Sequence, residues 1–233
     1  MLELDKIYCM DCLEGMKQIE NESIDLILTD PPYNMNKEFA GENLDINQFN
    51  QFHVAYLNEF KRIIKPHKPI IICFGNGEYF DDYLCLSNPL LNFKRFITIY
   101  KPNDCSYPTG TLLRKSEAVL VFSSNGSLSY EGDKNIHDVL ISNHGKKDIT
   151  FWHPSVKPLK IISDLVLSFS KKNDLILDCF MGSGTTAVAC NKLSRHFIGF
   201  EINPEYVKMA KKRLSNVPNK LELFINDSKK MGV

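Results

Sequence analysis

The stretch NDLILDCFMGSGTTAVAC, from Asn173 to Cys190, is the part of the sequence that decides the fold. Its apolar start is typical of a buried strand, Gly182-Ser183-Gly184 predicts a tight turn, and the small and apolar residues that follow predict a helix. Glycines at such a turn let the backbone approach a ligand, and the first N–H groups of the helix are free to bind it. The stretch therefore predicts a ligand-binding strand–turn–helix unit of an α/β sheet.

A carboxylate follows this unit at the end of the next predicted strand. Glu201 closes the run FIGFE, 23 residues beyond Asp178. An acidic residue at this place holds the ribose hydroxyls of adenosine in nucleoside-binding α/β folds. Gly182, Gly184 and Ala187 also fit G-x-G-x-x-A, so these residues alone leave NAD as an alternative ligand, and a turn that binds nothing as another.

Further apolar runs predict the rest of the sheet. Several are apolar at consecutive positions, which is typical of strands covered on both faces, and helical spacing of apolar residues appears in 49–63, after Pro158 and after Asn203. We expect one domain over 1–233, with a seven-stranded, mostly parallel sheet between helices. The seven predicted strands are Ile7–Met10, Ile24–Thr29, Ile70–Phe74, Phe96–Tyr100, Ala118–Phe122, Leu175–Cys179 and Phe197–Ile202.

The composition is typical of a globular protein, and it argues against a strongly basic, a disulfide-rich or a membrane-spanning protein. Hydrophobic residues make up 43% and charged residues 24%, and the 28 basic side chains balance 28 acidic ones, so a nucleic-acid site would have to be a local patch. Seven cysteines without C-x-x-C spacing predict reduced thiols, and the opening residues lack a signal-peptide pattern, so we expect a cytoplasmic protein. No run approaches the roughly 20 apolar residues that span a bilayer.

A second turn with unusual chemistry lies early in the chain, where the predicted strand Ile24–Thr29 leads into Asp30-Pro31-Pro32-Tyr33. The two prolines fix φ and remove two N–H donors, so the turn is rigid and rich in acceptors. We expect Asp30 and the Pro31 carbonyl to accept the two N–H bonds of an amino group on a base, while Tyr33 stacks on the ring. An ordinary proline turn at the surface is the alternative.

Methyl transfer to such an amino group explains why both acceptors are needed. The nitrogen is a poor nucleophile because its lone pair is delocalised into the ring. Two acceptors bias it toward tetrahedral geometry and raise its electron density as a methyl donor approaches in line. A duplex buries this nitrogen, so the target base would have to rotate out of the stack.

These motifs together resemble the DNA amino-methyltransferases, in the permuted β class in which the catalytic turn precedes the cofactor loop. DCFMGSGTT at 178–186 resembles the S-adenosylmethionine loop, and FIGFEINPEY at 197–206 resembles the ribose-binding segment. YCMDCLEGM at 8–16 and HPSVKP at 153–158 are similar to segments near the adenine and the methionine end of the cofactor. The resemblance implies that Asp30, Pro31, Pro32 and Tyr33 are catalytic. It implies that the cofactor is bound by Asp11, His153, Lys157, Asp178, Phe180, Gly182, Ser183, Gly184, Thr185 and Glu201.

The resemblance also implies a Rossmann-like α/β fold with permuted motif order, S-adenosyl-L-methionine as cofactor and no metal. Asp rather than Ser before Pro-Pro-Tyr favours site-specific methylation of adenine N6 in double-stranded DNA over cytosine N4, and the absence of a Pro-Cys pair disfavours cytosine C5. RNA or protein-amide methylation and a non-catalytic DNA-binding module remain alternatives.

Partners and recognition elements follow from the same resemblance. Duplex DNA is the expected substrate, and a cognate endonuclease of a restriction-modification system and a second copy in a homodimer are further candidate partners. Residues 123–152 are expected to form a short target-recognition insertion, and residues 34–46 a mobile catalytic or DNA-contacting loop.

Overall fold

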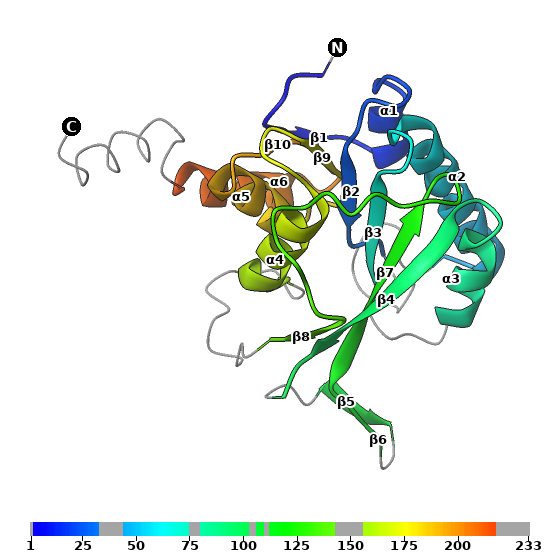
Figure 1. Cartoon of the computed structure of the whole chain (residues 1–233). Helices are drawn as coiled ribbons and strands as arrows, with labels where there is room; N and C mark the ends of the chain where they lie inside the picture. Colours follow the sequence, from blue (N-terminus) through cyan, green and yellow to red (C-terminus); the bar gives the residue numbers. More distant parts are fainter. Residues whose placement is uncertain are drawn as a thin grey trace.

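The computed structural model describes residues 2–32, 44–74, 80–102, 106–109, 112–142 and 156–217. Within these ranges, an eight-stranded sheet lies between two layers of helices (Figure 1). In spatial order, its strands are β1 Lys6–Cys9, β10 His196–Glu201, β9 Leu175–Asp178, β2 Leu26–Thr29, β3 Pro69–Phe74, β7 Ser116–Ser123, β4 Asn92–Tyr100 and β8 Val139–Ile141.

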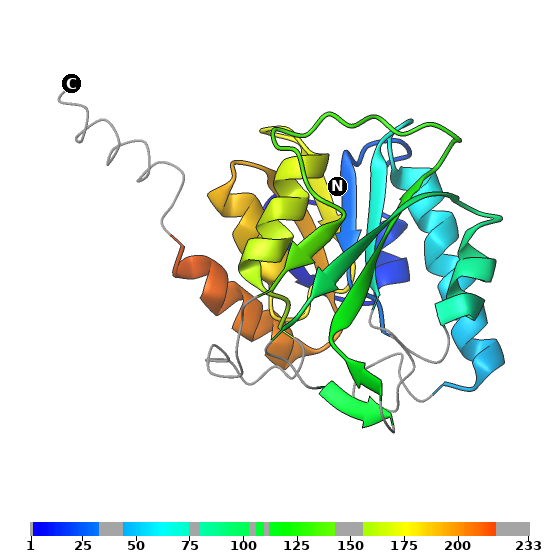
Figure 2. The same cartoon turned by 60° about the horizontal axis from the view of Figure 1, so that its bottom comes forward.

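Each face of the sheet is covered by three helices (Figures 1 and 2). One layer consists of α1 Cys12–Met16, α2 Ile46–Ile63 and α3 Phe80–Ser87, and the other of α4 Leu159–Phe169, α5 Thr185–Lys192 and α6 Pro204–Ser215. The consecutive apolar residues of the inner strands serve both layers: Leu26 and Leu28 of β2 pack under α4 and α5, and Ile27 packs under α2. The predicted α/β architecture, with helices on both faces, is confirmed.

The sheet is mixed, and the predicted number of strands is wrong. Five of the seven pairings in the sheet are parallel, whereas β7 runs antiparallel to both of its neighbours. All seven predicted strands are present, but β8 adds an eighth at the edge, inside a region predicted to be a loop. β8 has three residues and buries only Leu140, which is too short for a recognisable apolar pattern. A separate antiparallel pair joins β5 Ser106–Thr109 to β6 Leu112–Arg114.

Polar capping residues explain where two of the helices begin. Asn203 accepts a hydrogen bond from the N–H of Glu205 at the start of α6, and Asp45 forms a capping box with Gln48 at the start of α2. Of the expected loop 34–46, residues 34–43 lie outside the described part of the chain, and Ile46 already belongs to α2. Among the described helices, none has both the length and the apolar character needed to cross a bilayer.

The order of the strands creates a crevice at their carboxyl ends. From β9 the chain crosses through α5 to β10, whereas from β2 it crosses through α2 on the opposite face to β3. Neighbouring strands whose crossovers leave in opposite directions diverge at their carboxyl ends, and ligands bind at such a switch point. The fold therefore predicts a ligand site between the ends of β9 and β2.

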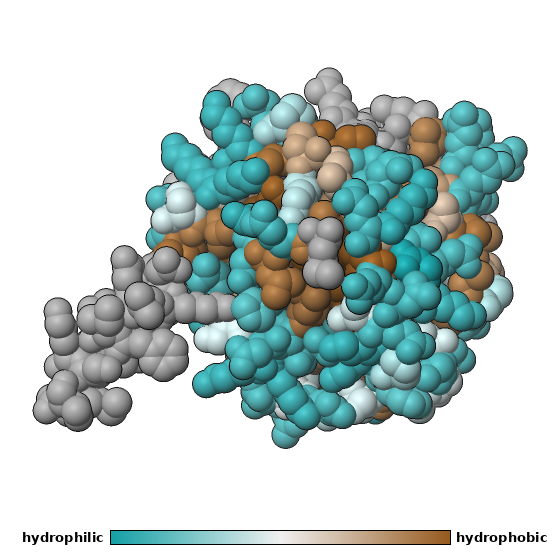
Figure 3. Space-filling view, turned by 90° about the horizontal axis from the view of Figure 1, so that it is seen from above, coloured by the Kyte–Doolittle hydropathy of each residue, from teal (hydrophilic) through white to brown (hydrophobic). Residues whose placement is uncertain are grey.

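Residues 124–138, here called the strap, lie at the opposite edge of the sheet. Ser129 N donates to the carbonyl of His67, just before β3, and Arg195, just before β10, donates to the carboxylate of Asp133 at 2.5 Å. Seen from above, this end of the molecule shows mostly hydrophilic residues around a smaller hydrophobic area (Figure 3).

The first half of the expected insertion 123–152 consists mainly of the strap. This half fastens the start of the parallel strands and lies away from their carboxyl ends. β8 then runs parallel to β4 toward the carboxyl edge and ends at Ile141. Residues 143–152 lie outside the described part of the chain.

Candidate active site

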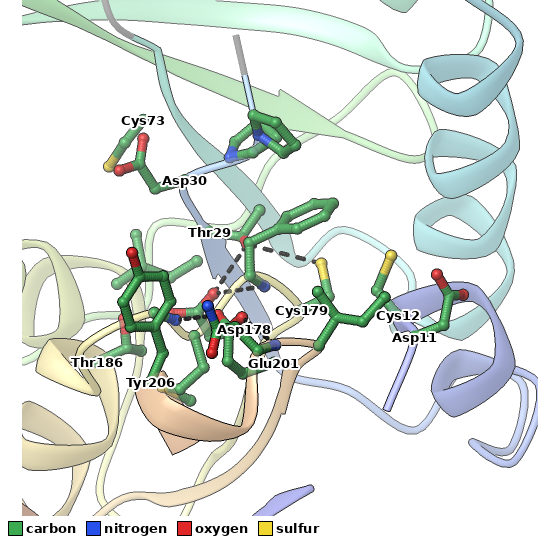
Figure 4. Close-up of a pocket in the computed structure, with 18 of the residues that line it drawn as sticks. Asp11, Cys12, Thr29, Asp30, Cys73, Asp178, Cys179, Thr186, Glu201 and Tyr206 are labelled. Atoms are coloured by element: carbon green, nitrogen blue, oxygen red, sulfur yellow. Dashed lines mark hydrogen bonds between the residues drawn. The ribbon is translucent and has the colours of Figure 1, made fainter. Parts of the chain in front are cut away.

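A cavity of about 620 Å³ opens at the carboxyl edge between β9 and β2 (Figure 4). This volume is within the range of about 300–1,000 Å³ that is typical of cofactor sites. Tyr33 and His153 lie outside the described residues, and Gly184 does not line the cavity. The predicted site residues that do line it are Asp11, Asp30, Pro31, Pro32, Lys157, Asp178, Phe180, Gly182, Ser183, Thr185 and Glu201.

Three carboxylates enter the cavity from three neighbouring strands. Glu201 ends β10, Asp178 ends β9, and Asp30 directly follows β2. Because these strands are parallel and adjacent, their carboxyl ends meet at one edge, although Asp30 and Asp178 are far apart in the sequence. The sheet topology thus brings the two predicted motifs into one site.

Glu201 is held by two backbone N–H groups. Its Oε2 accepts from Gly182 N at 2.8 Å, and its Oε1 accepts from Asn203 N at 2.8 Å. Burial raises the pKa of this carboxyl, and the backbone N–H groups partly oppose the change. Each carboxylate oxygen has a further lone pair, so the side chain can also accept hydrogen bonds from two hydroxyls of a ligand.

Asp178 lies deeper, and the described donors that hold it are neutral. Its Oδ1 accepts from Thr29 Oγ1 at 2.9 Å and from Phe180 N at 3.1 Å. Burial raises the pKa of Asp178 to about 6, against the opposing effect of the Thr186 and Thr29 hydroxyls. Thr29 was not predicted as a site residue, since a threonine at the end of a strand has no distinctive sequence signal.

In the glycine turn, Gly182 lines the cavity and Gly184 packs against α6. Gly182 and Gly184 have φ values of +50° and +82°, in the left-handed region that favours glycine. A Cβ on Gly184 would lie 2.7 Å from the Cβ of Ala210 in α6. Gly184, predicted as a cofactor residue, therefore allows α5 and α6 to approach each other behind the cavity.

Arg213 of α6 reaches the same turn from behind. Its Nη1 donates to Ser183 O and Ser183 Oγ, both at 2.7 Å, and to Thr185 Oγ1 at 3.1 Å. A basic residue in the last turn of a helix is favoured by the helix dipole, and Lys212 and Arg213 both lie in the last turn of α6. Arg213 has a further role, because its guanidinium fastens the turn that lines the cavity.

Asp11 and Phe180 form the wall on the side of α1 and α2. The Asp11 carboxylate caps α1 by accepting from Leu13 N at 2.8 Å and from Glu14 N at 3.2 Å. The Phe180 ring meets Phe52 and Tyr56 of α2 edge to face, with centroids 6.0 and 5.5 Å apart. These contacts give a rigid aromatic surface suited to the flat part of a ligand.

Asp30 forms an ion pair with a lysine. Its Oδ2 lies 3.1 Å from Lys157 Nζ, and that ammonium lies 3.2 Å from Oε2 of Glu117 on β7. Burial raises the pKa of Asp30 to about 6, although the Lys157 ammonium acts to lower it. Glu117 was not predicted as a site residue, and Lys157 was expected at the methionine end of the cofactor.

Comparison with known proteins adds family evidence to this geometry. A family model described as DNA methylase matches residues 24–212. Type II methyltransferase M.HpaI of Haemophilus parainfluenzae is 29% identical, over 91% of this chain and 74% of that protein. DNA adenine methyltransferase YhdJ of Escherichia coli (strain K12) is also 29% identical, over 88% of this chain and 80% of that protein.

Solved structures share the fold. The PvuII DNA methyltransferase, described as cytosine-N4-specific, superimposes with a TM-score of 0.78 at 20% identity, over 96% of this chain and 91% of that chain. The M1.HpyAVI–SAM complex gives a TM-score of 0.69 at 25% identity, over 90% of this chain and 99% of that chain. The match extends over nearly the whole length in both cases.

Proposed function

We propose, from the premise that this chain belongs to the DNA methylase family, that it is an S-adenosyl-L-methionine-dependent methyltransferase acting on the exocyclic N6 of adenine at a specific site in duplex DNA. One observation carries the proposal: Asp30 and the loop formed by Gly182 and Ser183 line the same cavity, with Glu201 beside the loop. A base presented to Asp30 would thus lie next to a ligand bound at the loop.

The residues of the cavity fit the cofactor. When bound, S-adenosyl-L-methionine supplies an electrophilic methyl group. Glu201 has carboxylate lone pairs available for the ribose hydroxyls, and the Phe180 ring offers an apolar surface to the adenine. M1.HpyAVI, with a related fold, has been solved with SAM, which supports the same choice here.

Asp30 acts on the substrate amino group rather than on the cofactor. Its carboxylate accepts one N–H bond, the Pro31 carbonyl accepts the other, and Tyr33 stacks on the base. Both acceptors are fixed in position before the base arrives, so they favour the geometry in which the nitrogen attacks. The base reaches them only after rotating out of the duplex.

Adenine is favoured over cytosine because Asp rather than Ser precedes Pro-Pro-Tyr, and because YhdJ, a relative of similar identity, is named as an adenine methyltransferase. Cytosine N4 is the second candidate, since the fold of the cytosine-N4-specific PvuII enzyme matches nearly the whole chain. The catalytic turn precedes the cofactor loop along the sequence, in agreement with the permuted β class.

Sequence readout is assigned to the segments that leave the carboxyl edge. β4 ends and β7 begins at this edge, so the connection through β5 and β6 starts and finishes there. The connection from Ile141 to Val156 also starts and finishes there, as does the loop 34–46 between the Asp30 turn and α2. A cognate endonuclease and a homodimer are further proposals that follow from restriction-modification relatives such as M.HpaI.

Methyl transfer from radiolabelled S-adenosylmethionine tests the function directly. We expect label in duplex DNA, in a base that digestion identifies as N6-methyladenine, and a single sequence context on sequencing. RNA and bulk protein serve as competing acceptors in the same assay. Label in N4-methylcytosine would correct the base, and label confined to RNA or protein would refute the proposal.

A further inference from the structure

The ammonium of Lys157 lies between two carboxylates that belong to different strands. It is 3.1 Å from Asp30 Oδ2, beyond the end of β2, and 3.2 Å from Glu117 Oε2, on β7. Only 12% of the Lys157 side chain is exposed. Burying an ammonium is costly unless it is paired, so Lys157 requires both partners.

A second lysine extends the pair into a chain of alternating charge. Lys101, which follows β4, forms an ion pair with Oε1 of Glu117, and its backbone N–H donates to Lys115 O at 2.8 Å. In the spatial order β2, β3, β7 and β4, the network Asp30–Lys157–Glu117–Lys101 therefore crosses the carboxyl edge of four neighbouring strands. The two positive and two negative charges cancel.

The electrostatics of the network have opposite effects on its two carboxyls. Burial acts to raise the pKa of Glu117, but Lys157 and Lys101 outweigh it and lower that pKa to about 2. Burial also raises the pKa of Asp30, and there the ammonium groups of Lys157 and, more weakly, Lys101 oppose it only in part, leaving the pKa at about 6. Glu117 is thus a permanent anion, whereas Asp30 is close to titration.

We propose that Lys157 and Glu117 are positioning residues for the catalytic carboxylate: Lys157 keeps Asp30 ionised, and Glu117 shares the ammonium so that Asp30 can still accept the substrate amino group. This inference rests on the proposed function. It assigns Lys157 to the base-binding side of the cavity, whereas the sequence resemblance assigned it to the methionine end of the cofactor.

Charged or titratable groups from several elements act on Asp30, and the Tyr83 hydroxyl of α3, whose pKa burial raises, is one of those that interact with it. Lys157 precedes α4, Glu117 lies on β7, and Lys101 follows β4. The thiol of Cys73 on β3 lies beside Asp30 (Figure 4), and burial raises the pKa of this thiol, so it stays neutral. Asp178 of β9 has a pKa raised to about 6, mainly by burial and slightly by Asp30.

The first test is Lys157→Met, with the rate of duplex methylation measured from pH 5 to 9 at saturating cofactor. A cation beside a carboxylate lowers its pKa by about 1–3 units, so the acidic limb should move up by that amount. The rate at pH 7 should then fall by between about twofold and a hundredfold. The affinity for S-adenosylmethionine should stay within about twofold, because Lys157 acts through Asp30.

The matched control is Lys160→Met. This variant removes an ammonium three residues downstream that is 73% exposed and pairs with Asp164, away from Asp30. Its pH profile should match that of the wild type. Lys157→Arg, which keeps the positive charge, should restore the position of the acidic limb.

Glu117→Gln should shift the acidic limb of the pH–rate profile in the opposite direction. Removing this anion should move the acidic limb to lower pH, since Glu117 raises the pKa of Asp30. The plateau rate should nevertheless fall, because Lys157 then bonds to Asp30 alone and competes with the substrate amino group. Loss of packing would not move the two profiles in opposite directions, and this variant also serves if Lys157→Met does not fold.

A carboxyl ¹³C NMR titration of Asp30, assigned by its absence in Asp30→Asn, measures the same shifts without turnover. Unchanged Asp30 titration in both variants would overturn the network. If Lys157→Met lost cofactor affinity tenfold or more while its acidic limb did not move, Lys157 would be a cofactor-binding residue and not a positioning residue for Asp30. A wild type that methylates no DNA would refute the proposed function, while the NMR titration would still decide the network.

Discussion

Asp178 and Asp30 lie at the same edge of the sheet, on adjacent strands, but they are held in different ways. Among the described residues, Asp178 accepts hydrogen bonds from neutral O–H and N–H donors, whereas Asp30 pairs with the Lys157 ammonium. Burial raises the pKa of both to about 6. Neutral donors can fix a carboxylate in either protonation state, but an ammonium favours the charged form. Asp178 is therefore suited to shaping a binding loop, whereas Asp30 is held in a way that suits a group acting as an anion.

The largest effect on activity is expected when the Asp30 carboxylate is removed. Asp30→Asn should lower kcat by about 10²–10³-fold, as does the loss of one preorganised group that stabilises a transition state. Cofactor affinity should stay within about twofold of the wild type in calorimetry. Asp138→Asn, which changes an exposed carboxylate on the strap, is the control. Full turnover by Asp30→Asn would remove the distinction between the two carboxyls.

Asp178→Asn should change the pH dependence of stability. A carboxyl whose pKa rises from 3.8 to about 6 on folding contributes stability below 3.8 that is lost as the pH rises through 6. The wild type should therefore lose about 2–3 kcal/mol more unfolding free energy than the variant between pH 4 and 7. Urea unfolding at several pH values measures this difference. Parallel curves for the two proteins would contradict it.

Glu201→Gln should weaken cofactor binding by about 10–100-fold, because hydrogen bonds to a charged group contribute about 1.5–3 kcal/mol. At saturating cofactor, kcat should stay close to that of the wild type, since Glu201 does not touch the base. Calorimetry and single-turnover kinetics separate the two quantities. A large fall in kcat with unchanged affinity would place Glu201 on the catalytic side of the comparison.

The smallest effect is expected at Arg213, which contacts the glycine turn from behind. Arg213→Met should weaken cofactor binding by less than about tenfold, because it removes donors to Ser183 and Thr185 but no ligand contact. Lys212→Met, at an exposed neighbouring position of α6, is the control. Equal affinities for both variants would show that the turn keeps its shape without the guanidinium.

Local sequence patterns were sufficient for most of the sheet and for the cofactor side of the site. The glycine turn and Glu201 lie on one continuous strand–helix–strand segment, so their spacing along the chain predicts their proximity. The seven predicted strands each have at least four residues and an apolar run. The helix α1 and the strand β8 have five and three residues, too few for a periodic pattern.

The network around Asp30 could not be predicted for a different reason. Glu117, Lys101 and Lys157 come from three separate segments, and only the strand order β2-β3-β7-β4 brings them together. In the sequence, each is a single charged residue of the kind that is usually solvated. Lys157 drew attention through a family motif, but its partners depend on long-range packing. A pattern within one segment cannot specify such partners.

The strap holds the fold together at the edge of the sheet opposite to the cavity. Arg195 is 1% exposed and joins Asp133 to the start of β10, at the opposite edge from the cavity. The contacts of the strap that fasten the sheet therefore lie away from the carboxyl edge, where the proposed function assigns sequence readout. Under that proposal, new sequence specificities could arise by replacing residues 143–152, a segment that includes neither the strap nor the candidate cofactor residues His153 and Lys157.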